Sequence, residues 1–340
     1  MVTEDDLGAQ FFVNDADVGK NRAEAALPEI QKLNPRVKVT AVAESILSFA
    51  PEFYAPFTLI IACDLPFASF STVNAAARLA SKPCYLAGVH GFYGFIFADL
   101  IEHTYIIERD MSNRTTVLGP ETDTRSIISS SKKKENGKTV ELVGKREIYS
   151  PLLLANTSPL PKDTLRNRRR LKAVSPLLSC LRALWDFEKT TNRTPLATHE
   201  AAADQSDLIA FTSLAKNAHR DLQLPAETLT GDFLKSFLLN LGAELAPVTA
   251  FLGGQLAQDV INVLGGREQP IQNFLLFDGE ESKGTVYPLH PIFQDGLDEV
   301  AAAATAAATA SASASVAAAA AVEVGLADGV VVPDEEVVIL

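Results

Sequence analysis

Short, almost wholly apolar runs alternate with helix-length segments over the first 110 residues. Runs of this kind are typical of strands that are buried on both faces of a sheet. They occupy residues 57–63, 83–89 and 94–99, and a segment of alternating polar and apolar residues at 37–43 predicts one more strand. The intervening segments 18–33 and 67–82 have the length of helices. We therefore expect an α/β fold, a Rossmann-like and mostly parallel sheet with flanking helices.

Two helix boundaries can be placed from the sequence. The first helix is expected to stop at Asn34-Pro35. Pro28 lies inside it and predicts a break or kink, because proline lacks the amide donor that its helical turn needs.

The remainder of the chain divides into three segments of different composition. Residues 111–165 are polar, and the Ser- and Lys-rich part at 129–138 indicates a variable loop. Residues 166–290 combine a helical region with a probable hairpin formed by 274–279 and 284–289. Residues 291–340 are an Ala-rich, acidic tail that we expect to be disordered. Together with residues 1–110, which are expected to form part of a Rossmann-like sheet, these three give four predicted segments.

The charge of the chain excludes one class of partner. Its 42 acidic and 30 basic residues give a net charge of −12, of which about half belongs to the acids of the tail. A nucleic-acid-binding protein needs basic surface to neutralise phosphates, so we expect no nucleic-acid partner. The Ala-rich stretch at 300–322 lacks the Leu and Phe that favour insertion, so we expect no membrane span either.

No motif in the sequence supplies an intact catalytic or metal site. The glycines of Gly88–Gly94 lie between two strands and offer no helix N-terminus to a phosphate. The histidines and cysteines are widely spaced. We expect the histidines to be surface or structural residues and Cys63, Cys84 and Cys180 to be buried. The histidines stand at His90, His103, His199, His219 and His290.

A basic run, Arg166–Lys172, permits two interpretations. It could be a nuclear-localisation or phosphate-binding patch. The favoured interpretation is a solvated helix start that leads into the apolar run Leu177–Trp185.

A combination of motifs resembles one protein family. The residues that carry it are Glu4–Phe12, Val18–Ala25, Leu33–Pro35, Gly91–Leu100, Ala246–Asp259 and Asn273–Gly279. In this order they resemble the non-catalytic, Aos-type subunits of SUMO-activating enzymes, within the ThiF/MoeB-type adenylating superfamily. The resemblance covers about residues 2–290. It implies a ThiF-type fold and a heterodimer in the nucleus and cytoplasm.

The resemblance also implies where the chemistry is done. In such complexes, ATP and Mg²⁺ serve to adenylate the modifier SUMO, which then passes to a cysteine of the catalytic subunit. Active members carry an acidic residue and an arginine where this chain has Leu65 and Phe70. Leucine cannot ligate Mg²⁺, and Asp64, one position earlier, is expected to point to the other side of an extended segment. Arg22 stands at the position of the catalytic lysine as a vestige.

We therefore expect no catalytic residue, no intact cofactor site and no metal site in this chain. ATP and Mg²⁺ are expected in the partner subunit. The late helix at 246–264 is expected at the subunit interface, because its apolar faces and paired glycines suit close packing. The interface candidates are Phe251, Gly253, Gly254 and Gln255.

The family pattern begins before residue 1 of this chain. Its members place a strand, a Gly-rich loop, a helix and a second strand ahead of the motif that starts here at Leu7. We therefore expect that the first strand–loop–helix portion of the fold is missing from this chain, which leaves an uncovered strand edge.

Three other functions remain open. The chain could be the regulatory subunit of a NEDD8-activating enzyme, although those chains carry a large helical insertion that 111–165 cannot supply. It could be a stand-alone ThiF/MoeB-type adenylyltransferase or a Rossmann oxidoreductase, which the missing Gly-rich loop and Leu65 oppose. It could also be a non-enzymatic scaffold.

The end of the tail carries a last hypothesis. Val330–Leu340 sets short aliphatic runs beside acids and resembles a SUMO-interaction motif, which binds by adding a strand to a sheet edge. The favoured interpretation is a disordered acidic tail.

Overall fold

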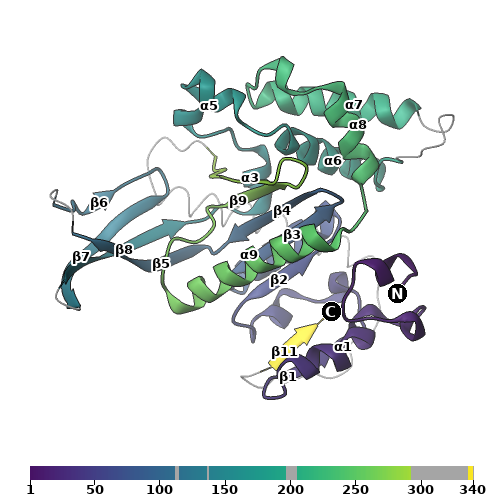
Figure 1. The fold of residues 1–340 in the computed structure, drawn as a ribbon, viewed down its shortest axis with the longest axis horizontal. Helices are drawn as coiled ribbons and strands as arrows, with labels where there is room; N and C mark the ends of the chain where they lie inside the picture. Colours follow the sequence, from purple (N-terminus) through teal and green to yellow (C-terminus); the bar gives the residue numbers. More distant parts are fainter. Residues whose placement is uncertain (112–114, 136–137, 197–204, 292–335, 340) are drawn as a thin grey trace.

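The computed structural model describes residues 1–111, 115–135, 138–196, 205–291 and 336–339. Figure 1 shows a central sheet with helices on both faces, a second sheet that extends away from it, and a small N-terminal unit. The N-terminal unit contains the short helices η1 (Asp5–Gly8) and η2 (Asp15–Asp17), the helix α1 (Arg22–Leu33) and the strand β1 (Lys38–Ala41).

The central sheet has five strands in the order β10-β9-β4-β3-β2. Its strands are β2 (Ile60–Cys63), β3 (Cys84–His90), β4 (Tyr93–Asp99), β9 (Phe274–Asp278) and β10 (Lys283–Tyr287). The α/β, Rossmann-like prediction is confirmed. The strand direction needs a correction, because only β2 and β3 pair in parallel, and the other neighbours are antiparallel.

Two hydrophobic cores lie on the two faces of this sheet. Alternate residues of β4 enter different cores, with Phe95 and Phe97 on one face and Ile96 and Ala98 on the other. This alternation follows from the pleat of a strand, which directs successive side chains to opposite faces. The period-2 pattern therefore explains why β3 and β4 consist almost wholly of apolar residues.

The first core is covered by most of the helices. They are η3 (Ile46–Ser48), η4 (Pro51–Tyr54), α2 (Phe67–Leu79), α3 (Leu152–Thr157), α4 (Lys162–Leu165), α5 (Arg168–Lys172), α6 (Leu177–Thr191), α7 (Gln205–Asp221), η5 (Ala226–Thr228) and α8 (Gly231–Asn240). Residues 166–265 are thus mainly helical where the structure describes them. On the opposite face of the sheet runs a single long helix, α9 (Ala246–Gly265).

A buried ion pair ties α2 to the end of β4. The guanidinium of Arg78 donates to both carboxylate oxygens of Asp99, from Nε at 2.6 Å and from Nη2 at 2.8 Å. The amide of Asn74 donates to the same carboxylate at 2.7 Å. The side chain of Arg78 is 6% exposed and that of Asp99 is fully buried.

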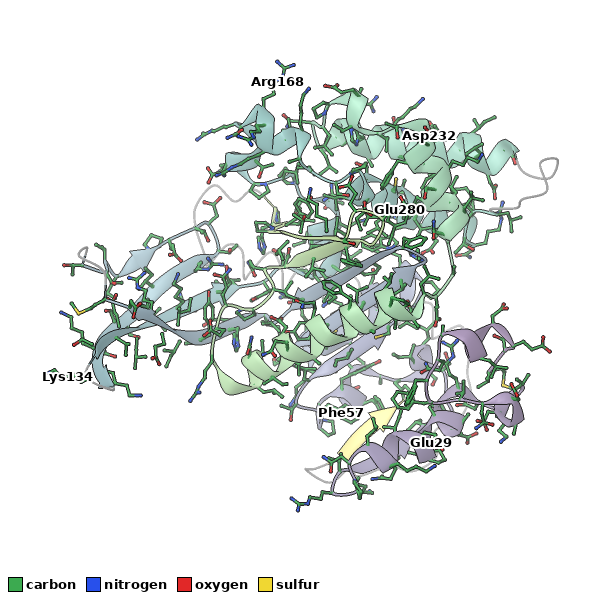
Figure 2. All side chains as sticks on the ribbon, in the orientation of Figure 1. Glu29, Phe57, Lys134, Arg168, Asp232 and Glu280 are labelled. Atoms are coloured by element: carbon green, nitrogen blue, oxygen red, sulfur yellow. The ribbon has the colours of Figure 1, made fainter. Side chains whose placement is uncertain are left out.

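The segment predicted as a polar loop is instead a sheet of four strands, in the order β5-β8-β7-β6. These strands are β5 (Glu102–Asp110), β6 (Gly119–Pro120), β7 (Arg125–Glu135) and β8 (Lys138–Ile148). One face of this sheet carries ion pairs among its buried residues, as between Arg125 and Glu147 at 2.6 Å. Figure 2 shows Lys134 near its far end. The loop prediction failed because pairing with β8 satisfies the backbone of a polar segment whatever its side chains.

Two local predictions also need correction. Helix α1 continues through Pro28, with Ala23, Ala25 and Ala26 buried, so the packing of this face outweighs the bond that proline removes. Cys84 and Cys180 are buried as expected, whereas Cys63 is exposed because β2 lies at the edge of the sheet.

The C-terminal tail contributes one described element. Strand β11 (Glu336–Ile339) pairs with β1, so these four residues are ordered against the N-terminal unit rather than disordered. The rest of the expected disordered tail, 292–335, lies outside the described residues. No helix among the described residues is long and apolar enough to cross a membrane.

Candidate functional site

The position expected to bind Mg²⁺ lies where β2 ends and α2 begins. Asp64 has a positive φ of 51°, and its Oδ1 accepts a 2.9 Å hydrogen bond from the backbone N–H of Val89. Its neighbour Leu65 is partly buried against the first core. The carboxylate is thus tied to the adjacent strand end.

The position expected to carry an arginine is apolar. Phe70 is 2% exposed and packs edge-on against Phe95, with 5.9 Å between ring centroids. Mg²⁺ requires oxygen ligands, and phosphate requires positive charge. Leu65 and Phe70 supply neither, so the residues at this place do not fit an Mg²⁺–ATP site.

Arg22, which was expected at the position of the catalytic lysine, forms an ion pair with Asp6. The buried Asp6 also accepts hydrogen bonds from the backbone and hydroxyl of Thr3. Burial of the carboxyl opposes ionisation, but the Thr3 hydrogen bonds and the guanidinium outweigh it and lower the pKa of Asp6. Arg22 therefore holds the N-terminal segment against the start of α1.

Cys63 and His219 have different surroundings. Cys63 is exposed as a residue, but the packing around its sulfur, and then the nearby Asp64 carboxylate, raise the pKa of its thiol to about 12, which disfavours a thiolate. His219 lies between Ser179 and Thr228, within 3.0 Å of each. Among the described residues, no cluster of three or more His, Cys, Asp or Glu could hold a metal ion. His199 lies outside them.

The glycine-rich segment predicted to join two strands does so. It forms the turn between β3 and β4, where Gly91 has a φ of +58°. A side chain there would overlap Asn240, because a Cβ at Gly91 would lie 1.9 Å from the Asn240 Oδ1.

Helix α9 has a buried face and an open face. The buried residues Val248, Leu252, Leu256 and Val263 pack on the second core. The helix carries a single charged residue, Asp259. Its carboxylate accepts a 2.7 Å hydrogen bond from the phenol of Tyr85 and a 3.0 Å hydrogen bond from the backbone N–H of Ile271. Burial raises the pKa of Asp259, and these hydrogen bonds partly offset the rise.

The open face of α9 is uncharged along the whole helix. The interface candidates Gly253, Gly254 and Gln255 are exposed on it. Phe251 is partly exposed and stacks on Phe277 with 4.2 Å between centroids. A Cβ at either glycine would meet nothing within 4 Å, so no part of this chain requires these glycines for its own packing.

The open face of α9 also contains exposed residues that were not among the interface candidates predicted from the sequence. Ile261 is 64% exposed and Leu264 is 61% exposed. The face continues onto β5, because the backbone of the exposed Ile106 bonds to that of Gly266 and Glu268 at the end of α9. The sequence does contain a pattern that could have identified these residues. Small and apolar residues recur at helical spacing and form a second stripe along the helix, at Phe251, Gly254, Ala257, Ile261 and Leu264.

A polar cleft borders the open face of α9. It has a volume of about 350 Å³ and lies between the helix and the segment 269–272. Five carboxamides line it: Gln255, Gln258, Asn262, Gln269 and Gln272. An exposed apolar strip beside a polar border is typical of a protein–protein interaction site.

Comparison with known proteins identifies the family and several relatives. The ThiF family profile matches residues 1–294. The DNA damage tolerance protein RHC31 of Saccharomyces cerevisiae is 33% identical over 287 residues, which is 82% of this chain and 78% of that protein. The human SUMO-activating enzyme subunit 1 is 27% identical over 294 residues, which is 86% of this chain and 80% of that protein. The DNA damage tolerance protein rad31 of Schizosaccharomyces pombe is 25% identical over 291 residues, or 85% and 79% of the two chains.

Proposed function

Since the chain belongs to the ThiF family, we propose that it is the regulatory, catalytically inactive subunit of a heterodimeric SUMO-activating enzyme. Several of its relatives are named SUMO-activating enzyme subunit 1. In this function the chain supports the ATP-dependent adenylation and thioester activation of SUMO by a partner subunit.

The observation that carries the proposal is the apolar surrounding of Leu65. This residue stands where an active member needs an acid, and it packs against the first core. The adjacent Asp64 is tied to Val89. We therefore assign the binding of ATP and Mg²⁺ to the catalytic partner, and this chain retains a docking function.

The open face of α9 is the proposed docking surface. A rigid helix about 30 Å long, without an exposed charge, can be covered by another protein at little desolvation cost. The buried hydrogen bonds of Asp259 hold this helix on the sheet, so the surface is formed before the partner binds. Phe251, Gly253, Gly254 and Gln255 would lie in the contact.

Co-expression with a catalytic subunit tests the proposal. The tagged chain should capture the partner, and the complex should form a SUMO thioester only when ATP and Mg²⁺ are present. The chain alone should not exchange pyrophosphate with ATP in the presence of SUMO, and exchange by the chain alone would contradict an inactive subunit.

Other results would point to the alternatives. A thioester with NEDD8 in place of SUMO would identify the complex as a NEDD8-activating enzyme. Capture of the partner without thioester formation would indicate a scaffold. The proposal also places the chain in the nucleus and the cytoplasm, which imaging of the tagged chain tests.

A further inference from the structure

Strand β1 has two edges that are occupied in different ways. On one edge, the side-chain amide of Gln31 takes the place of a neighbouring strand. Its Nε2 donates to the backbone carbonyl of Val37 at 2.6 Å, and its Oε1 accepts from the backbone N–H of Val39 at 3.1 Å. Successive backbone groups of a strand point alternately to its two edges. The groups of Lys38 and Thr40 therefore face the opposite edge.

The opposite edge is filled by β11. The two strands form a separate parallel sheet, in which Lys38 is paired with Glu336 and Ala41 with Ile339. Figure 1 shows β11 beside β1 and α1, away from the strands of the central sheet. Residues about 300 positions apart in sequence thus pair in a defined register.

The sequences of the two strands are complementary. Arg36 precedes β1 and Lys38 begins it, whereas Asp334 and Glu335 precede Glu336 in the tail. Parallel pairing sets Lys38, the first residue of β1, opposite Glu336, the first residue of β11. The remaining residues of β11, Val337–Ile339, are β-branched and therefore suited to an extended conformation.

We propose that the edge of β1 opposite Gln31 is an acceptor site for short acidic–aliphatic peptides, and that its ligand is this chain's own C-terminal segment, Glu336–Ile339. The site adds a strand to an existing one, with main-chain hydrogen bonds for affinity and the Arg36 and Lys38 charges for direction. Gln31 leaves only one edge of β1 open, which sets the side on which the peptide binds.

This arrangement has a consequence for the tail. While the segment is paired with β1, the edge of β11 that faces β1 cannot pair with another protein. A ligand tethered to its own site also has a high effective concentration, of the order of millimolar, so a free peptide of the same sequence competes poorly. The β1 edge therefore occupies one edge of Glu336–Ile339, which belongs to the segment that resembles a SUMO-interaction motif.

Peptide binding tests the site. A fluorescent peptide of residues 333–340 is titrated into the full chain and into a variant that ends at Pro333, and anisotropy is recorded. We expect saturable binding to the shortened variant and at least tenfold weaker binding to the full chain. Equal binding to both would overturn the proposal.

A matched pair of proline substitutions tests the register. In a parallel pair, a residue bonds to the neighbours of its partner, so Val337, opposite Val39, faces Lys38 and Thr40. The N–H of Val338 faces away. In the peptide, Val337→Pro should therefore abolish binding, whereas Val338→Pro should keep the affinity within about threefold. Equal losses would contradict the register.

Hydrogen exchange in the full chain provides a readout that does not need the shortened variant. Val337→Pro should speed exchange at the Thr40 amide and leave the Val39 amide, which Gln31 holds, unchanged. An unchanged Thr40 amide would overturn the proposal. A second copy of the chain is the other candidate source of the strand. A dimer of the full chain that the shortened variant does not form, detected by ultracentrifugation, would refute pairing within one chain.

Discussion

The phenol of Tyr85 on β3 donates a 2.7 Å hydrogen bond to the carboxylate of Asp259 on α9, across 174 positions of sequence. Both residues are buried. The bond joins the sheet to the one charged residue of the helix that we propose as the docking surface. Together with the buried residues Val248, Leu252, Leu256 and Val263, it fixes which face of α9 packs on the sheet.

The first prediction concerns this hydrogen bond. Tyr85→Phe should lower the free energy of unfolding by about 1–3 kcal/mol, because a buried carboxylate loses one of its donors. Urea unfolding followed by the fluorescence of the buried Trp185 measures the loss. Tyr149→Phe is the matched control, since Tyr149 is buried and its hydroxyl has no hydrogen-bond partner. A cost for Tyr149→Phe as large as that for Tyr85→Phe would contradict the assignment.

The second prediction concerns the ion pair of Arg78 and Asp99. Arg78→Leu should destabilise the chain by about 3–5 kcal/mol, because it leaves a buried carboxylate without its cation. The exposed pair of Lys32 and Glu29 provides the comparison, and Lys32→Ala should cost less than about 1 kcal/mol. Denaturant midpoints measure both changes, and similar costs would show that burial of the pair does not govern its contribution.

The third prediction tests the docking surface. Ile261→Asp places a charge on the open face of α9 and should reduce capture of the catalytic partner at least tenfold, with a change in stability within about 0.5 kcal/mol. Ile209→Asp on α7 is the matched control, because Ile209 is 67% exposed and Ile261 is 64% exposed. If both variants capture the partner as the parent chain does, α9 is not the docking surface.

The fourth prediction concerns pH. Burial of the His290 ring lowers its pKa to about 3, whereas an unfolded histidine has a pKa of about 6.5. Between these values the unfolded chain binds a proton that the folded chain does not, so stability falls as the pH decreases below about 6.5. In His290→Gln, the unfolding free energy should decline less steeply between pH 6.5 and 5. Curves of equal slope for the parent and the variant would exclude His290 as a cause.

Much of the fold could be predicted from local patterns. The continuous apolar runs of β3 and β4 require burial on both faces whichever way the strands run. The sequence shows that Leu65 and Phe70 stand where active members of the family carry an acidic residue and an arginine. It also shows that α9 contains only one charged residue. These features depend on the composition of single segments.

Other features depend on pairs of segments. The antiparallel directions of β4 and β9 were not predicted, because a period-2 pattern specifies which faces are buried and not which way a strand runs. The hairpin of β7 and β8 was missed, because its polar strands are held by cross-strand backbone bonds and ion pairs such as that of Arg125 with Glu147. Cys63 is exposed because β2 has a neighbour on only one side among the described strands.

The sequence by itself thus determined the class of the fold, the family, the apolar replacement of the expected metal and phosphate ligands, and the helix with two apolar stripes. The tertiary structure was needed to decide which stripe of α9 is open, and to pair the tail with β1. The physical reason is that hydrophobic periodicity is a property of one segment. The Tyr85–Asp259 hydrogen bond and the register of Lys38 with Glu336 exist only when distant segments meet.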